Sequence, residues 1–182
     1  MLSNLKKIAK NSRKACEKKI DSKKKDAVLI KFTSLLLINK KKIILENIKD
    51  IKFAKKKKLK ENLIKRLEIN EEKIIDIINS VKQIIKLKDP TNKILESWKR
   101  PNRLVIKKVT VPIGIIAVIY ESRPNVTSDV ASLCFKSGNA VILRGGSEAF
   151  NTNKIISNLF RKSLRICGVD KNYVQFIGSK NR

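Results

Sequence analysis

VPIGIIAVIYESRPNVTSDVASLCFKSGNAVILRGGS, residues 111–147, is the stretch of this chain that decides its fold. An apolar run leads into a polar turn, an amphipathic segment that closes at Gly138, a second apolar run and a second polar turn. This order predicts strand, loop, helix, strand and loop, which is the unit from which parallel α/β sheets are built. Because open α/β sheets bind ligands at the carboxyl ends of their strands, we expect a site at the two turns.

The same pattern continues toward the C-terminus. Ile115 to Tyr120 is apolar without alternation, which is typical of a strand covered on both faces. Ser128 and Asp129 are expected to open the short helix that follows, and Ala140 to Leu143 forms the second strand. A further helix ending near Gly168 is marked by Ile155, Ile156, Leu159, Phe160 and Leu164, and a third strand is predicted over 173–177.

The first hundred residues have a helical period instead. Helices are predicted over 2–20, 25–38, 43–57 and from a cap at Asn70 to Lys88, where Asp89-Pro90 stops the last one. The predicted inward positions of the middle two helices are Val28, Leu29, Phe32, Leu35, Leu36, Ile44, Ile48 and Ile51. We therefore expect a helical segment over 1–100 and, over 101–182, an exposed strand at 104–111 followed by an incomplete βαβαβ sheet of the Rossmann type.

The composition is strongly basic. The chain of 182 residues carries 43 Lys+Arg against 16 Asp+Glu, a formal net charge of +27. Such a charge favours a nucleic-acid partner, but aromatic residues make up only 5% and no nucleic-acid motif accompanies the lysines. Lysine spread over the wet faces of amphipathic helices is the preferred interpretation, and binding of nucleic acid is the alternative.

Several site classes are excluded by residue type. The chain contains no histidine, so the His-based triads and zinc motifs cannot form. Its three cysteines, Cys16, Cys134 and Cys167, lie far apart in sequence, and we expect no metal site and a reducing compartment. No apolar run is long enough for a membrane span and no secretory signal is seen, so a cytoplasmic protein is expected.

The first turn, Glu121 to Thr127, carries Arg123 and Asn125 on either side of a rigid proline. An Arg at a strand end can grip a phosphate or carboxylate, and an Asn amide there is a good oxyanion donor. The turn matches neither GxGxxG nor the Walker sequence. The alternative is that Asn125 merely caps the following helix.

The second turn, Arg144-Gly145-Gly146-Ser147-Glu148, offers two glycines where the backbone must approach something closely, beside an Arg that can hold a phosphate. The alternative is a flexible β–α turn with Ser147 as the N-cap and Glu148 at the positive end of the helix.

YESRPNVT and SGNAVILRGGSEA, at residues 120–127 and 137–149, closely resemble the gamma-glutamyl phosphate reductase family, a branch of the aldehyde dehydrogenase superfamily. Similarity extends upstream through WKRPNRLVIKKVTVPIG, NIKDIKFA and LIKRL. The resemblance implies an aldehyde-dehydrogenase-like fold. It also implies a cytoplasmic oxidoreductase of proline biosynthesis that uses NADPH to reduce gamma-glutamyl phosphate to glutamate 5-semialdehyde.

The resemblance also implies roles for residues of both turns. Asn125 stands where the superfamily places an oxyanion-hole Asn. Arg144 stands where a basic residue contacts the adenosine ribose or its 2′-phosphate, with Ser147 and Glu148 as neighbouring ribose contacts. A role for Arg123 as a ligand of substrate phosphate or carboxylate is inferred from its chemistry alone.

Family members are more than twice as long and carry a catalytic domain with a nucleophilic cysteine, which no cysteine here matches. We therefore expect the catalytic domain to be absent and the chain alone to be inactive, whether it is a fragment or the product of a shortened gene. A non-catalytic remnant with a role in assembly is the further alternative, and the 104–111 strand is the expected homo-oligomer contact.

Overall fold

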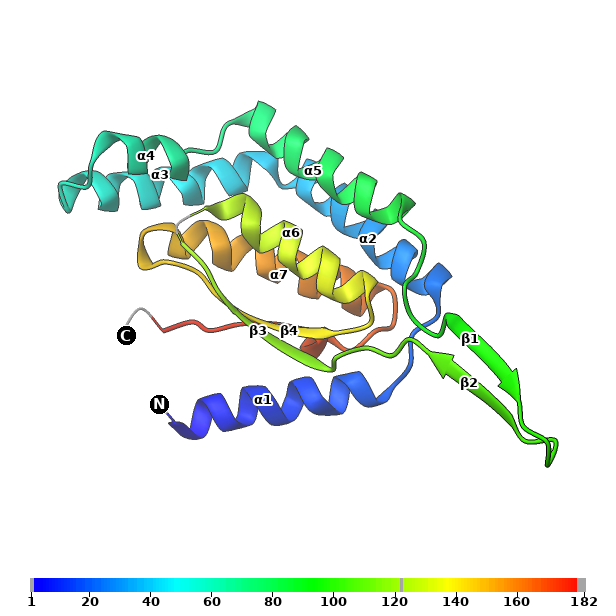
Figure 1. Ribbon diagram of the computed structural model, residues 1–182. Helices are drawn as coiled ribbons and strands as arrows, with labels where there is room; N and C mark the ends of the chain where they lie inside the picture. The colour runs from blue at the N-terminus through cyan, green and yellow to red at the C-terminus, as the bar shows by residue number, and fades with distance from the viewer. Residues whose placement is uncertain (1, 122, 180–182) are drawn as a thin grey trace.

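The computed structural model describes residues 2–121 and 123–179 (Figure 1). The helices are α1 (Leu2–Glu17), α2 (Ser22–Ile38), α3 (Lys40–Lys56), α4 (Glu61–Leu67), α5 (Glu71–Lys86), α6 (Pro124–Lys136) and α7 (Phe150–Ile166). The strands are β1 (Ile94–Lys99), β2 (Val105–Val109), β3 (Ile115–Ile119), β4 (Ala140–Arg144) and β5 (Val174–Phe176). Two short 3₁₀ turns, η1 (Ser147–Ala149) and η2 (Lys171–Tyr173), complete the elements.

The centre of the molecule is a parallel sheet in the order β3-β4-β5. Helices α6 and α7 cover one face of this sheet and α1 lies against the other (Figure 1). Helices α2, α3 and α5 form a further layer on the outer side of α6 and α7. The sequence prediction of helices followed by βαβαβ with an α/β fold is confirmed.

The core lies between the sheet and these two helical layers. The rings of Phe32 and Phe160 approach to 4.6 Å between centroids, and Phe135 meets Phe160 and Tyr173 edge to face at 5.8 Å and 5.6 Å. All four side chains are buried. Aromatic packing of this kind fixes α2, α6 and α7 to one another and to the turn before β5, and so holds the sheet in place.

Two predicted helical faces have different outcomes. The five apolar residues predicted to face inward on α2 are all buried, and Asn70 accepts a hydrogen bond from the Lys73 amide at 2.8 Å as the cap of α5. The predicted face of α3 is right at Ile44, which packs against the core, but wrong at Ile48, which is 41% exposed. The fully buried positions of α3 include the polar Asn47 and Asp50 instead. Their polar partners, described below, explain why this face is not apolar.

Two predictions near the first turn are also wrong. Strand β3 is not covered on both faces in the described chain, since Ala117 and Ile119, which share one face of the strand, are exposed, Ile119 by 82%. Helix α6 does not open at Ser128 and Asp129 but at Pro124, with Arg123 as the N-cap residue. Proline is well suited to the first helical position because its missing N–H needs no partner there.

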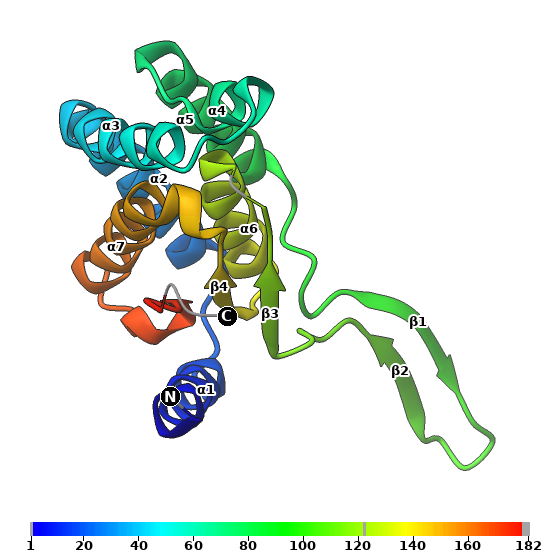
Figure 2. The same cartoon turned by 90° about the vertical axis from the view of Figure 1, so that its left-hand side faces the viewer.

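The predicted exposed strand at 104–111 is confirmed as β2, but its partner β1 was not predicted. The two strands pair antiparallel, with Trp98 opposite Ile106, and the hairpin projects from the body of the molecule (Figure 2). Every residue of β1 is exposed. The sequence signal for β1 is weak because its apolar residues face no core.

No helix in the described part of the chain is long and apolar enough to cross a membrane.

Candidate functional site

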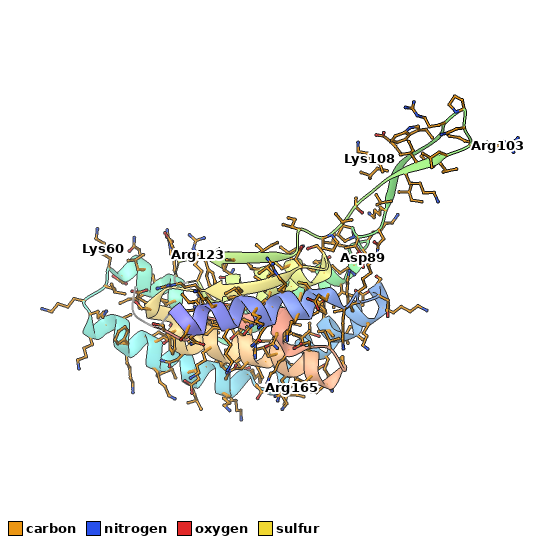
Figure 3. The ribbon with its side chains drawn as sticks, turned by 90° about the horizontal axis from the view of Figure 1, so that it is seen from below. Lys60, Asp89, Arg103, Lys108, Arg123 and Arg165 are labelled. Carbon is orange, nitrogen blue, oxygen red and sulfur yellow. The ribbon has the colours of Figure 1, made fainter. Side chains whose placement is uncertain are left out.

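A cavity of about 780 Å³ opens at the carboxyl ends of β3 and β4. Its lining comes from both sequence-predicted turns, from the α3–α4 corner and from the residues after β5: Leu59, Leu63, Arg66, Leu67, Ile119, Tyr120, Glu121, Arg123, Arg144, Gly145, Gly146, Ser147, Glu148, Phe150 and Ser179. Figure 3 shows Arg123 and Lys60, the latter at the α3–α4 corner, at the end of the molecule away from the hairpin. The cavity volume is in the range of small-molecule sites.

The sheet brings the two turns together. Ile119 pairs with Arg144 in the parallel register, and the Tyr120 amide donates to the Arg144 carbonyl at 3.1 Å. Both strands leave the sheet at this level, so the side chains that follow them converge. This is the geometry that the strand-end prediction required.

Gly145 stands where no side chain fits. A Cβ atom there would lie 2.2 Å from Asn153 Nδ2 and 3.0 Å from the Tyr120 ring. The backbone of the second turn therefore lies in close contact with α7 and with the first turn. The interpretation that the Gly-Gly pair marks a place where the backbone approaches another group closely is confirmed at Gly145.

A chain of hydroxyl and amide groups lies behind this contact. The Thr127 hydroxyl donates to Asn153 Oδ1 at 2.9 Å, which leaves its oxygen to accept from the Tyr120 hydroxyl at 2.7 Å. Burial raises the pKa of Tyr120 to about 12, and the Thr127 contact opposes this only in part. Tyr120 therefore stays a neutral hydrogen-bond donor at ordinary pH, and it ties β3 through α6 to α7.

Helix α7 is capped by a residue from a distant element. Asp50 of α3 accepts from the Asn151 and Thr152 amides at 3.1 Å and 2.8 Å, and from both of their side chains at 2.9 Å and 2.7 Å. Asp50 is 1% exposed, and its carboxylate accepts hydrogen bonds from the backbone amides that an N-cap side chain would otherwise bind. Ser147, the N-cap in the alternative interpretation of this turn, instead donates its hydroxyl to Glu148 Oε1 at 2.8 Å. The interpretation of Ser147 as the cap is therefore wrong.

Asn47 extends this contact to the wall of the cavity. Its amide donates to the Leu67 carbonyl at 2.8 Å and its oxygen accepts from the Ile69 amide at 2.8 Å. Leu67 in turn packs with Ala54 and Ala149 in a small buried cluster. Asn47 and Asp50 thus hold α4 against the start of α7, and α4 supplies Leu63 and Arg66 to the cavity.

Four of the five sequence-predicted residues meet at the cavity. Arg123, Arg144, Ser147 and Glu148 all line it, with Arg66 as a further cation. Among the described residues that line the cavity, three arginines outnumber the two carboxylates, Glu121 and Glu148. The cavity therefore suits an anionic ligand whose hydroxyl groups can donate to a carboxylate.

Asn125 is not among the residues that line the cavity, although it follows Arg123 by two positions. It is the second residue of α6 and exposed, so the alternative that it caps this helix is wrong. Its side-chain amide donates to Asp129 Oδ2 at 3.4 Å. The Asn125 side-chain amide therefore lies at the first turn and makes a hydrogen bond to Asp129 of the same helix.

The cysteines do not contribute to this cavity. Cys134 is buried, as predicted, and burial raises the pKa of the Cys134 and Cys16 thiols, so neither is an activated thiolate. Cys16 donates to the Gly114 carbonyl at 3.3 Å, away from both turns. Within residues 2–121 and 123–179, no cluster of acidic and cysteine side chains could hold a metal ion.

Sequence reasoning missed the contributions of α3 and α4. A seven-residue helix is short for a periodic signal, although Leu63 and Leu67 stand four apart. Asp50 and Asn47 carry no local sequence signal, because the partners of Asp50 lie about one hundred residues away and Leu67, a partner of Asn47, lies 20 residues away.

Comparison with known proteins gives one consistent result. No family model matches the chain. A gamma-glutamyl phosphate reductase from Carboxydothermus hydrogenoformans is 44% identical over 177 residues, which are 96% of this chain and 43% of that protein. One from Desulforamulus reducens is 38% identical over 183 residues, 100% of this chain and 44% of that protein. The chain thus spans less than half the length of these curated relatives.

Solved structures agree. The gamma-glutamyl phosphate reductase of Thermotoga maritima superposes with a TM-score of 0.95 at 37% identity, covering 98% of this chain and 44% of that one. The Saccharomyces cerevisiae reductase gives 0.89 at 32% identity, covering 96% and 46%. A probable aldehyde dehydrogenase from Listeria monocytogenes gives 0.73 at 12% identity over 98% of this chain and 37% of its own, which shows the fold alone. The predicted aldehyde-dehydrogenase-like fold is confirmed.

Proposed function

We propose that this chain, which belongs to the gamma-glutamyl phosphate reductase family, forms the N-terminal part of an enzyme that reduces gamma-glutamyl phosphate with NADPH to glutamate 5-semialdehyde and phosphate. An oxidoreductase assignment follows from the relatives, whose names state the reductase activity and its substrate. The observation that carries the proposal for this chain is the cavity, in which both family-like turns meet with a surplus of arginine.

The second turn is the proposed cofactor contact. Arg144 at the end of β4 would hold the adenosine ribose or its 2′-phosphate, a charge that distinguishes NADPH from NADH. Glu148 would accept from the ribose, while Ser147 completes the turn. The absence of a side chain at Gly145 fits this use, because it lets the turn pack tightly against α7 while Gly145 itself lines the cavity. When bound there, NADPH supplies the hydride of the reaction.

The first turn is the proposed substrate contact. Arg123, exposed at the start of α6, would bind the phosphate or the carboxylate of the substrate. Asn125 would donate to the carbonyl oxygen as it gains negative charge, an oxyanion contact that a preorganised amide makes without reorganisation. The amides at the N-terminus of α6 add a favourable dipole for the same charge.

The nucleophile is proposed to lie outside this chain. Acyl transfer from the phosphate to a thiolate, with loss of phosphate, would precede reduction of the acyl group. Neither buried Cys134 nor Cys16 is an activated thiolate, and none of the three cysteines lines the cavity. We therefore expect turnover only when a segment bearing the thiol is present together with this chain.

The experiment is a phosphate-dependent assay of NADPH formation from glutamate 5-semialdehyde. The isolated chain should give no turnover, and addition of the cysteine-bearing remainder of a relative should restore it. Asn125→Ala should then lower the rate by about a hundredfold, in line with loss of one oxyanion donor. Turnover by the isolated chain that Asn125→Ala abolishes would overturn the assignment of the nucleophile to another segment.

The partner proposed for the hairpin is a second copy of the chain. The strand at 104–111 is an open edge in a projecting hairpin, with Val105 53% exposed and Trp98 43% exposed. Edge strands of this kind pair readily with one another. Val105→Glu should lower the mass measured by light scattering, whereas Ile38→Glu, on α2 away from the hairpin, should not; equal masses for both variants contradict the contact.

A further inference from the structure

Asp129 contacts the amide that the proposed chemistry uses. The two residues are four apart on α6, so their side chains lie on the same side of the helix. Asp129 Oδ2 accepts from Asn125 Nδ2 at 3.4 Å. No charged partner for Asp129 appears among the ion pairs of residues 2–121 and 123–179.

The other carboxylate oxygen, Oδ1, is buried and has no hydrogen-bond partner in the part of the chain that the structure describes. Burial raises the pKa of Asp129, and the Asn125 contact only partly opposes this. A half-buried carboxylate without a cation destabilises the fold by itself. Such a group is typical of a site at which the residue has a use beyond stability.

We propose that Asp129 is a positioning residue that fixes the orientation of the Asn125 side-chain amide at the first turn. The inference rests on the proposed oxyanion role of Asn125. A carboxylate only accepts hydrogen bonds when ionised, so it selects the NH₂ end of the amide and excludes the carbonyl end. One N–H is then held by Asp129, and the second remains for the substrate oxygen.

Orientation matters here because an Asn amide has two ends of opposite polarity. If the carbonyl turned toward a developing oxyanion, the contact would repel it. A donor held in advance needs no reorganisation when charge develops, and that is the source of the effect of an oxyanion hole. The role is indirect, because Asp129 acts on substrate only through Asn125.

The variant that tests this is Asp129→Asn, which keeps the shape of the side chain but can present either a donor or an acceptor to Asn125. The matched control is Ser132→Ala, one turn further along α6, which removes another buried polar atom without a partner among the described residues. Thermal unfolding of both variants checks that the fold is kept.

The first readout is nuclear magnetic resonance of the chain. The ¹⁵N order parameter of the Asn125 side-chain amide should be high in the unsubstituted chain and in Ser132→Ala, and should fall in Asp129→Asn. An order parameter that is equal in all three overturns the inference. This measurement does not depend on activity.

The second readout is turnover by the reductase that contains this chain. Asp129→Asn should lower kcat about tenfold, part of the hundredfold effect of losing the donor, with the KM for NADPH unchanged. If Asn125→Ala lowers turnover about a hundredfold while Asp129→Asn leaves it unchanged, the inference fails and the proposed function stands. If neither substitution affects turnover, the oxyanion role proposed for Asn125 fails.

Discussion

At Gly145 the fold has room for a hydrogen atom and nothing larger. The atoms that a Cβ would meet there belong to Asn153 and Tyr120, both held by Thr127. Neither can move without breaking that chain of hydrogen bonds, so steric conflict at this residue must displace the backbone of the turn.

Gly145→Ala is therefore expected to destabilise the chain by about 1–3 kcal/mol, the usual cost of overpacking, and to displace Arg144 and Ser147 from the cavity. Urea unfolding measures the loss. Gly178→Ala is the matched control, because a Cβ there meets nothing within 4 Å. Equal stability of the two variants contradicts the steric role of Gly145.

At the level of single residues, the sequence predicted which side chains stand at the two strand ends. Arg123, Arg144, Ser147 and Glu148 were placed at strand ends by pattern, and the parallel register brings them to one cavity. The sequence could not predict which polar side chains form hydrogen bonds with elements that are distant in the chain. Ser147 looks like a cap in sequence, but Asp50 provides that function from α3.

At the scale of elements, one carboxylate of α3 makes most of the side-chain hydrogen bonds to α7 in the described chain, and Asn47 adds another to Thr152 at 3.2 Å. Asp50 accepts four hydrogen bonds at the N-terminus of α7, and all four donors belong to Asn151 and Thr152. Helix α7 begins just after the second turn, so this cap also fixes where that turn ends.

Asp50→Asn should destabilise the chain by about 2–3 kcal/mol, because an NH₂ group would then face backbone and hydroxyl donors in a buried position. The control is Asp21→Asn at the exposed cap of α2, where the Lys24 amide bonds equally well to either side chain. Denaturant unfolding measures the free energy of unfolding of both variants. If Asp50→Asn lowers it no more than Asp21→Asn does, the contact of Asp50 with α7 contributes little to stability.

The base of the hairpin is held to α2 by an ion pair. Lys25, 2% exposed, donates to Asp89 Oδ2 at 2.8 Å and to Thr91 Oγ1 at 3.3 Å. Burial raises the pKa of Asp89, but its hydrogen bonds with Lys25 and Thr91 outweigh this, so the pKa of the carboxyl group lies below its ordinary value.

A lowered pKa in the folded state means that ionised Asp89 stabilises the fold at any pH above the unfolded value, and that this contribution is lost as pH falls through the folded value. Asp89→Asn should thus cost about 2 kcal/mol near pH 7, and the difference should shrink below about pH 4. The control is Glu61→Gln, which removes an exposed ion pair with Lys65 and should change the free energy of unfolding little. If the loss of unfolding free energy in Asp89→Asn stays constant from about pH 7 to about pH 3, the ion pair with Lys25 is not the cause of that loss.

The buried face of a helix was predicted correctly where that face is apolar. The prediction failed where the buried side chains are polar and their hydrogen-bond partners are distant in sequence. The face of α2 follows its apolar period, whereas α3 buries Asn47 and Asp50, which only the positions of α4 and α7 explain. The covering of β3 was wrong for a related reason. A run of apolar residues shows that a strand can be buried on both faces, but it does not show what covers the strand.

For the molecule as a whole, the large positive charge is spread rather than concentrated. Lysines occur on the outer positions of nearly every helix, and Figure 3 shows charged side chains around the whole outline of the molecule. This distribution fits the preferred interpretation of solvated helical faces better than a single nucleic-acid groove. The arginines that matter for the proposed function are instead gathered at one cavity.

The proposed function depends on binding of NADPH in this cavity through Arg144. We would titrate NADPH into the purified chain and follow nucleotide fluorescence, with NADH in parallel. We predict saturable binding of NADPH that weakens about tenfold or more in Arg144→Ala and is unchanged in Arg165→Ala, an exposed arginine at the far end of α7. Binding that is absent, or equally strong in both variants, contradicts the claim.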